Sequence, residues 1–258
     1  MNQGMEAFEE DGLKFYRWRI FSPWREDVDA VLTTRVGNLD LGFAGRKDSA
    51  ETAAQRRRIA GILGHPDAPW AVARQIHSTR LVTVGTRVES PYEGCDGFHI
   101  IRSGVIGAVL LADCLPVLLY DPIRRVGSVS HSGWRGTVGR IAGRAVEEMR
   151  AMGSRLRDLY AAVGPGIGAC CYDVGDDVAD RFRDAFGIGR GVVQVDESGR
   201  TTLDLERANR AILVDAGLEA HHIGTAGFCT ACRRDEFYSY RKESGCTERH
   251  GALLMLRS

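Results

Sequence analysis

The sequence lacks net charge, with 34 basic and 34 acidic side chains among its 258 residues. Proteins that bind duplex DNA through its phosphates carry a surplus of basic residues, so this balance argues against a nucleic-acid partner. Lysine is almost missing, occurring only as Lys14, Lys47 and Lys242, so arginine supplies nearly all the positive charge. Arginine can hold an anion by two parallel hydrogen bonds.

Long apolar runs are also missing. No run reaches the ~18 residues that suggest a membrane helix, so we expect no membrane partner. The N-terminal residues, MNQGMEAFEEDG, include several acids and no apolar segment, which argues against a signal peptide. Seven cysteines are an odd number for a disulfide framework. We therefore expect a cytoplasmic protein with reduced thiols.

The sequence contains no internal repeat and no low-complexity linker. Short runs rich in Val, Ile and Leu predict strands over 30–34, 71–76, 81–84, 105–111, 117–120, 125–131, 159–163, 192–195, 223–228 and 252–256. Helical patterns cover 48–64, 137–153, 176–187 and 203–217. Adjacent strands mix with strand–helix units, which favours a single mixed-sheet α/β domain over a doubly wound parallel sheet.

A cysteine and a histidine stand at the ends of neighbouring apolar runs, in ADCLPVLLYDP (112–122) and VSHSGWRG (129–136). Pro116 cannot donate to a neighbouring strand, so we expect pairing to break near Asp113–Pro116 and Cys114 to lie at a strand end or a bulge. His131 precedes a glycine-rich turn and a helix, where backbone N–H groups suit an anion. The alternatives are a buried structural thiol and an ordinary tight turn.

A second histidine, His77, lies between two expected strands in ARQIHSTRLVTV. Histidine nitrogen and cysteine sulfur bind zinc well, and three protein ligands leave a fourth position open, as in catalytic zinc sites. His77, Cys114 and His131 form such a site only if the fold brings three strand ends together. The alternative is a core thiol with surface histidines.

Segments over nearly the whole chain from about residue 30 resemble the laccase-domain family, in the family's order. This family is also called multicopper polyphenol oxidase or peptidoglycan-editing factor proteins, and its members are regarded as zinc-dependent purine nucleoside phosphorylases. The matching segments are TTRVG (33–37), RQIHS (74–78), CDGF (95–98), ADCLPVLLYDP (112–122), HSGWRGTVG (131–139), VGPGIGACCYDVG (163–175), LDLERANRAIL (203–213) and FCTACRRDEFYSYRKESG (228–245).

The resemblance implies an α/β (α+β) fold, a single-domain α/β/β/α sandwich with mixed β-sheets over 1–258, in which 1–28 matches loosely. It implies that His77, Cys114 and His131 bind zinc. From the three-ligand set we expect about one zinc ion per chain, and the same residues could also take up copper. The implied activity is phosphorolysis of adenosine, inosine or methylthioadenosine to the base and (methylthio)ribose 1-phosphate, together with adenosine deamination. The partners are then a nucleoside and phosphate.

Two departures from the family pattern concern substrate contacts. The loop after TTR, here VGNLDLGF, is shorter than usual, and the C-terminal Thr-Gly-Arg reads TERH, which retains Arg249. Neither departure touches the three metal positions.

Three polar residues near these motifs are candidates for binding substrate. Arg135, at the expected helix entrance, is the favoured phosphate ligand, and Arg35 is a second arginine that could reach a phosphate. Gln75 would point to the same face of an extended strand as His77 and orient a substrate or a ligand. Surface arginines and a half-buried polar residue are the alternatives.

The remaining candidates flank the thiol and the later motifs. The expected catalytic set is Cys114, His131 and Asp113, where the carboxylate either relays protons or caps a turn. Tyr172 and Arg241 are expected to line the cleft, where an aromatic ring and a cation suit a purine and an anion. The pair in CTAC (229–232) has metal-ligand spacing, but no second CxxC is present, so we expect neither a metal nor a redox role for it.

Two other functions compete with nucleoside chemistry. A copper-dependent polyphenol oxidase needs many histidines, and this chain has seven and no His-x-His pair. A cysteine hydrolase acting on peptidoglycan precursors would use Cys114 as nucleophile and a histidine as base. Metal content separates these hypotheses.

Overall fold

The computed structural model describes residues 4–42 and 50–258, which form two large sheets and a small one. The seven-stranded sheet has the order β1 (Met5–Glu10), β2 (Leu13–Trp18), β3 (Val28–Thr33), β15 (His250–Leu256), β8 (Ile106–Leu111), β4 (Trp70–Arg74), β6 (Tyr92–Glu93). The six-stranded sheet has the order β14 (Ile223–Thr225), β11 (Tyr160–Val163), β9 (Leu115–Asp121), β10 (Val126–Ser132), β7 (Gly97–Ile100), β5 (Leu81–Val84). The third sheet is a hairpin of β12 (Val193–Val195) and β13 (Thr201–Leu203).

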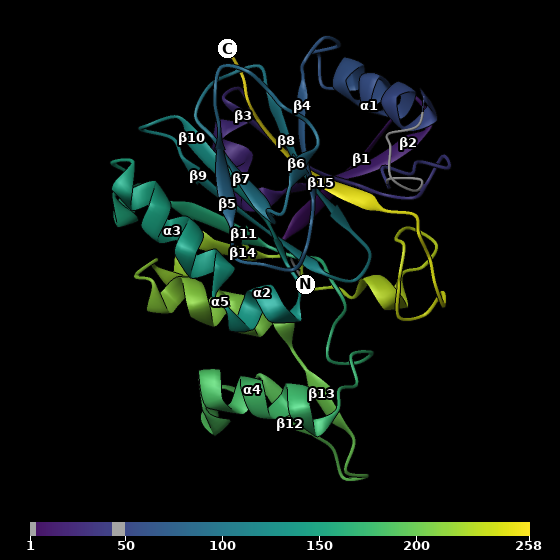
Figure 1. The fold of residues 1–258 in the computed structure, drawn as a ribbon, viewed down its shortest axis with the longest axis vertical. Coiled ribbons are helices and arrows are strands. Elements are labelled where there is room, and N and C mark those ends of the chain that lie inside the picture. Colours follow the sequence, from purple (N-terminus) through teal and green to yellow (C-terminus); the bar gives the residue numbers. More distant parts are fainter. Residues whose placement is uncertain (1–3, 43–49) are drawn as a thin grey trace.

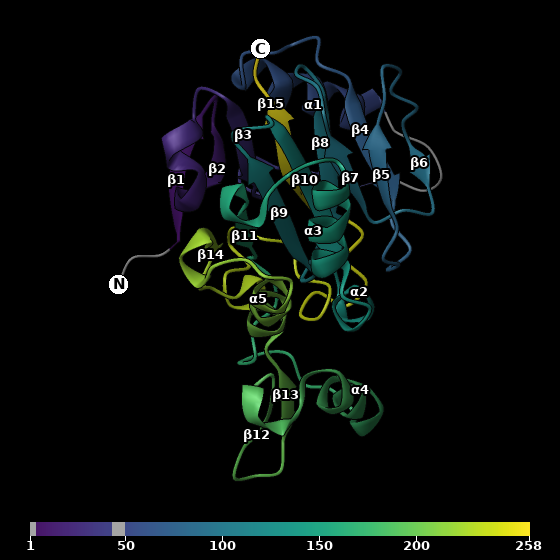
Figure 2. The same ribbon diagram turned by 90° about the vertical axis from the view of Figure 1, so that its left-hand side faces the viewer.

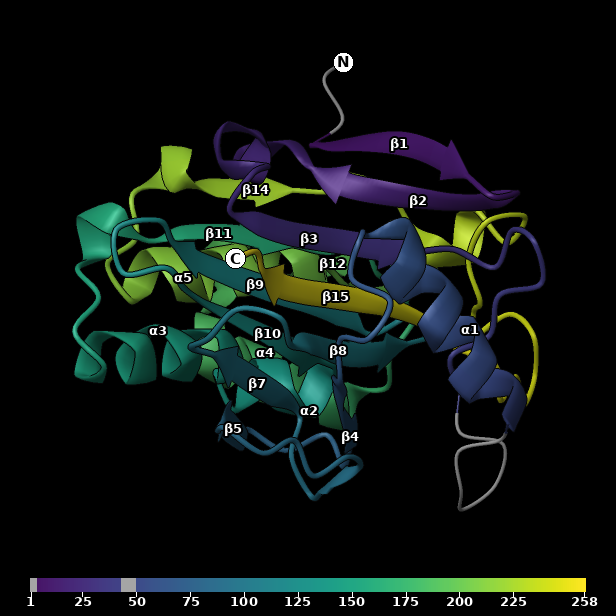
Figure 3. The same ribbon diagram turned by 90° about the horizontal axis from the view of Figure 1, so that it is seen from above.

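Both large sheets are mixed and they pack face to face. Parallel pairing joins β4 to β8 and β6, β11 to β14, and β5 to β7, whereas the other neighbours are antiparallel. Helix α1 (Ala50–Ile62) covers the outer face of the seven-stranded sheet, and α2 (Trp134–Val138), α3 (Ile141–Ala151) and α5 (Leu205–Asp215) lie on the side of the other sheet (Figures 1 and 3). The predicted mixed-sheet sandwich with outer helices is confirmed.

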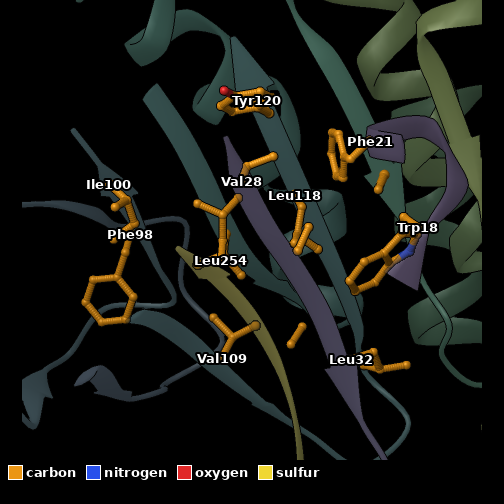
Figure 4. Close-up of a cluster of buried hydrophobic side chains, with 14 of the residues drawn as sticks. Trp18, Phe21, Val28, Leu32, Phe98, Ile100, Val109, Leu118, Tyr120 and Leu254 are labelled. Carbon is orange, nitrogen blue, oxygen red and sulfur yellow. The ribbon is translucent and has the colours of Figure 1, made fainter. Parts of the chain in front are cut away.

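Alternation along the strands explains these layers, because successive side chains of a strand point to opposite faces. In β9, Leu118 and Tyr120 face the other sheet, whereas Val117 and Leu119 pack toward α3 and α5. In β15, Leu254 likewise lies in the cluster between the sheets (Figure 4). Buried apolar area of this kind, at roughly 25 cal/mol per Å², is the main term that holds the layers together.

Helix α4 (Asp176–Phe186) and the β12–β13 hairpin project from one end of the sandwich (Figure 2). Phe182 and Phe186 of α4 are buried in the cluster that also contains residues of α3 and α5. The projection is thus packed onto the helical layer of the six-stranded sheet. None of the helices in the described residues is long and apolar enough to cross a membrane.

Of two local predictions, one is confirmed and one is wrong. Pairing breaks between the end of β8 at Leu111 and the start of β9 at Leu115, so Cys114 lies at a strand end. Pro116 itself lies inside β9, where a proline near the first residue of a strand is tolerated. The helix predicted over 137–153 is split into α2 and α3, because Arg140 adopts a left-handed conformation with φ of 61°.

The strands that the sequence did not predict are β1, β2, β6, β7 and β13. Strand β1 reads MEAFEE and lies at the edge of its sheet, so its side chains are largely polar and exposed. Strands β6, β7 and β13 have two, four and three residues. Runs this short carry too few apolar side chains to show a period of two.

Candidate metal centre

Three connections pass from one large sheet to the other at the same place. The β4–β5 connection carries His77, the β6–β7 connection carries Asp96, and the β8–β9 connection carries Cys114. His131 is close to the end of β10, which lies between β9 and β7. The sandwich therefore brings together residues that are far apart in sequence.

The ligand atoms of His77, Cys114 and His131 all lie within 4.8 Å of one another. The Cys114 Sγ is 4.0 Å from Nε2 of His77, and the centroids of the two imidazole rings are 4.8 Å apart. His131 is buried, Cys114 is half-buried and His77 is exposed. The cluster can therefore hold a metal ion that substrate reaches from the side of His77.

A buried carboxylate, Asp96, orients both histidines. It accepts hydrogen bonds from Nδ1 of His131 at 2.9 Å, from the backbone N–H of His77 at 2.9 Å, and from the N–H and Oγ of Ser78, both at 2.7 Å. The bond to Nδ1 leaves Nε2 of His131 for a metal, which is the usual arrangement of a carboxylate behind a histidine ligand.

Sequence reasoning assigned Asp96 no role. It belongs to the CDGF segment, and its only signal was an acid directly before the short apolar run of β7. Nothing in the local pattern distinguishes it from a carboxylate that caps a turn. Its importance comes from three chain segments that meet only in the folded protein.

The cluster favours the charged forms of Asp96, Cys114 and His131. Although burial alone would raise the pKa of Asp96, hydrogen bonds from His131 and Ser78 lower it to about 2. Burial would likewise raise the pKa of Cys114, but the neighbouring His131 and His77 lower it to about 6. A thiolate is the form of cysteine that binds metal. Burial alone would lower the pKa of His131, but Cys114 and Asp96 raise it to about 9, so metal binding would release a proton from this imidazole.

Space in the cluster depends on Gly133, in the turn before α2. A Cβ at this position would lie 2.9 Å from Sγ of Cys114 and 2.9 Å from Cδ2 of His77. Contacts this short would displace a ligand. The glycine-rich turn is therefore explained by this close approach, and α2 itself has only five residues.

The strand before His77 ends at Arg74, two residues earlier than predicted. His77 has a positive φ of 60°, so the extended geometry that placed Gln75 and His77 on one face does not apply. The Gln75 amide instead pairs with the backbone of Leu110 in β8, accepting from its N–H at 2.7 Å and donating to its carbonyl at 2.9 Å. Gln75 thus ties the His77 loop to the sheet, while also lining the cavity described next.

A cavity of about 770 Å³ opens over the cluster, a size that fits a small-molecule substrate. Besides the metal-ligand candidates, its walls include Trp134, Arg135, Tyr172, Arg241 and Arg249. Two of the guanidinium groups lie over aromatic rings, Arg135 over Trp134 at 4.3 Å and Arg241 over Tyr172 at 5.0 Å. The cavity thus combines aromatic faces with cations.

The positive charge in these walls is only partly neutralised, because, of the four arginines in the lining, Arg74 pairs with Glu93. Within residues 4–42 and 50–258, none of Arg135, Arg241 and Arg249 forms an ion pair with a carboxylate. The Nη1 atoms of Arg241 and Arg249 donate only to backbone carbonyls. An anion in the cavity would therefore meet guanidinium groups that retain their full charge.

The structure places two other predicted residues in structural contacts. Arg35 is not among the residues that line the cavity, and it pairs with Glu243. Asp113 lines the cavity, but its Oδ1 accepts from Thr230 at 2.9 Å, and its Oδ2 accepts from Ser239 at 2.9 Å and from a backbone amide. These bonds favour the turn-capping alternative for Asp113 over a proton relay.

A family sequence model described as multi-copper polyphenol oxidoreductase laccase matches residues 27–257. The chain belongs to this family. It is 40% identical over 238 residues to a purine nucleoside phosphorylase of Deinococcus radiodurans, covering 89% of each chain. It is also 36% identical over 235 residues to adenosine deaminase RL5 from an unknown prokaryote, covering 84% of this chain and 89% of the other.

Solved structures of the family share the fold. The crystal structure of YlmD from Geobacillus stearothermophilus matches with a TM-score of 0.90 at 30% identity, and the match covers 100% of both chains. The layered arrangement that carries the cluster is therefore that of an experimentally determined relative.

We predict that Asp96→Asn weakens metal binding. Asparagine presents one N–H₂ group where the carboxylate accepts hydrogen bonds on both oxygens, so His131 or the His77 loop loses its support. Loss of such a partner behind a metal-ligating histidine costs roughly 10–100-fold in affinity. Competition of the protein with a chromophoric chelator measures the zinc affinity. Asp67→Asn, at an exposed position, is the matched control and should leave the affinity unchanged; equal affinities for both variants would contradict the role of Asp96.

Proposed function

We propose that the chain is a zinc-dependent purine nucleoside enzyme. It cleaves adenosine, inosine or methylthioadenosine with phosphate, giving the base and the (methylthio)ribose 1-phosphate, and it deaminates adenosine. The observation that carries this proposal is the His77–Cys114–His131 cluster beneath a cavity lined by Arg135, Arg241 and Arg249, which pair with no carboxylate of the described residues. Two relatives, a purine nucleoside phosphorylase and an adenosine deaminase, support the substrate class.

The donor set fits zinc better than the copper of an oxidase. Two histidine nitrogens and one thiolate, with a fourth position open toward the cavity, make a catalytic type of zinc site. A blue-copper site adds a weak axial ligand, usually methionine, and the described residues that line this cavity include no methionine. Three further histidines, His99, His222 and His250, are buried outside the cavity lining.

Each part of the cavity has a task in these reactions. Zinc, when bound, supplies Lewis-acid chemistry and, through its open position, activated water. The guanidinium groups of Arg135, Arg241 and Arg249 bind phosphate, and the rings of Trp134 and Tyr172 offer faces for a purine.

In phosphorolysis, a phosphate oxygen bonds to C1′ of the ribose while the bond from C1′ to the purine breaks, and the leaving purine takes up a proton. In deamination, water adds at C6 and ammonia leaves.

One arrangement also fits a second function, a cysteine hydrolase. Asp96, His131 and Cys114 are connected in the order of a carboxylate–histidine–cysteine triad, because Asp96 holds Nδ1 of His131 at 2.9 Å. The triad gives no role to His77, whose Nε2 lies 4.0 Å from the same sulfur. Three converging ligands, rather than a nucleophile with one base, favour the metal reading.

We predict that incubation with inosine and phosphate yields hypoxanthine and ribose 1-phosphate. Single variants His77→Ala, Cys114→Ala and His131→Ala should each lose bound zinc and at least about 100-fold of the activity, because each removes one of three protein ligands. Chromatography of the products and elemental analysis of the protein measure both losses. Cys246→Ser, a half-buried cysteine outside the cavity lining, is the control and should keep both.

If the protein is a cysteine hydrolase, the Cys114 thiol is expected to be free and reactive. A nucleophilic Cys114 would be alkylated by iodoacetamide in fully active protein, and chelator treatment would leave activity unchanged. Release of base that depends neither on metal nor on phosphate, or several coppers per chain with phenol oxidation, would overturn the proposed function.

We predict that Arg135 contributes to phosphate binding and not to the deamination of adenosine. In Arg135→Ala, the KM for phosphate should rise about 10–100-fold, since a charge-assisted hydrogen bond is worth ~1.5–3 kcal/mol. Deamination of adenosine consumes no phosphate, so its rate should change little and serves as an internal control. Arg140→Ala, which removes a guanidinium paired with Asp215 outside the cavity lining, should affect neither. Steady-state kinetics of both reactions decide the point, and equal losses in the two reactions would argue against a phosphate role.

A further inference from the structure

Four cysteines form a second cluster that the metal centre does not use. Cys170 and Cys171 lie in the loop between β11 and α4, and Cys229 and Cys232 lie in the segment after β14. Their four sulfur atoms all lie within 4.8 Å of one another. The sequence showed a single CxxC and therefore predicted no metal, but the fold supplies the second pair from adjacent residues 170 and 171.

The spacing of the sulfur atoms fits a tetrahedral metal site. The Sγ of Cys232 is 3.6 Å from that of Cys170 and 3.5 Å from that of Cys171. Zinc–sulfur bonds of about 2.3 Å in a tetrahedron place the sulfur atoms ~3.8 Å apart. A disulfide would instead require about 2.05 Å, and all four residues are free thiols.

The surroundings resemble those of a thiolate metal site. The backbone N–H of Gly168 donates to Sγ of Cys229 at 3.2 Å, a hydrogen bond that steadies a sulfur ligand. A Cβ at Gly168 would lie 3.5 Å from Sγ of Cys170, so this turn is wrapped closely around the cluster. The guanidinium of Arg200, which pairs with Asp173, also donates to the carbonyl of Cys170 at 2.9 Å and so holds the backbone of one cysteine in place.

We propose that Cys170, Cys171, Cys229 and Cys232 hold a second, structural zinc ion. Binding releases the protons of the four thiols, and the four sulfur atoms fill the coordination sphere, which leaves no position for substrate. The expected content of the chain rises from about one zinc to about two.

The place of this site in the fold gives it a function. The loop that carries Cys170 and Cys171 also carries Ile167 and Tyr172, which line the substrate cavity. The segment that carries Cys229 also carries Thr230, whose Oγ1 holds Asp113. Zinc would fasten these two segments to each other beside the isolated bridge from Gly166 to Cys229, the Gly168 hydrogen bond and a small apolar cluster that contains Ile167 and Ala231. The site thus stabilises one wall of the cavity.

Elemental analysis of protein purified without added metal tests the proposal. Wild-type protein should hold about two zinc ions and Cys232→Ser about one, while Cys246→Ser should still hold about two. The double variant His77→Ala/His131→Ala should hold about one, and adding Cys232→Ser to it should remove that ion. A Cys232→Ser protein with the same zinc content as wild type would overturn the proposal.

Cobalt spectroscopy gives a readout that does not depend on activity. In the His77→Ala/His131→Ala background, Co²⁺ should produce the intense thiolate-to-metal charge-transfer absorption of a four-sulfur tetrahedral site, and one equivalent of Zn²⁺ should abolish it. If Cys232→Ser fails to fold, alkylation of wild-type protein replaces it: Cys170 and Cys232 should react only after chelation. Rapid alkylation before chelation, or a disulfide among the four cysteines in freshly isolated protein, would refute the zinc site.

Discussion

The hydrogen bonds of one buried carboxylate hold the candidate metal centre together. Asp96 is fully buried, and its charge is retained because His131 and two adjacent residues of the His77 loop donate to it. A buried charge without partners would cost several kcal/mol, so the loop, the imidazole and the carboxylate are stable only as a unit. His77 and His131 therefore depend on each other although they share no direct hydrogen bond.

The sandwich makes this unit possible through its connections rather than its strands. His77, Asp96 and Cys114 each lie where the chain crosses from the seven-stranded to the six-stranded sheet. Backbone in such crossings is not committed to ladder hydrogen bonds, so it can adopt the left-handed conformations of His77 and Asp113, with φ of 60° and 82°. Strained backbone of this kind is tolerated where the surrounding structure determines it, and it gathers at functional sites.

Much of the fold could be predicted from the sequence, because its central strands are apolar enough to stand out. β5 was predicted with its observed bounds, and β8 and β10 to within one residue. The edge strand β1 and the short β7 were missed because polar or brief strands carry little periodicity. The break between α2 and α3 was missed because arginine is not a residue type that indicates a left-handed backbone conformation, which Arg140 adopts.

The candidate site was predictable only for residue types with a characteristic chemistry. Cysteine and histidine are common metal ligands, and the resemblance to a known family assigned His77, Cys114 and His131 to one site. Asp96 was missed because carboxylates before strands are common, and the four-cysteine cluster was missed because its pairs come from segments 58 residues apart, from Cys171 to Cys229. Both depend on tertiary contacts that no spacing along the chain reveals.

Anomalous X-ray scattering, recorded on both sides of the zinc absorption edge from crystals of the purified protein, tests the central claim most directly. The account predicts a zinc peak among Nε2 of His77, Sγ of Cys114 and Nε2 of His131, with Asp96 still bonded to Nδ1 of His131. A peak held by Nδ1 of His131 with Asp96 displaced, a copper edge in place of the zinc edge, or no peak among the three residues in active protein would contradict it.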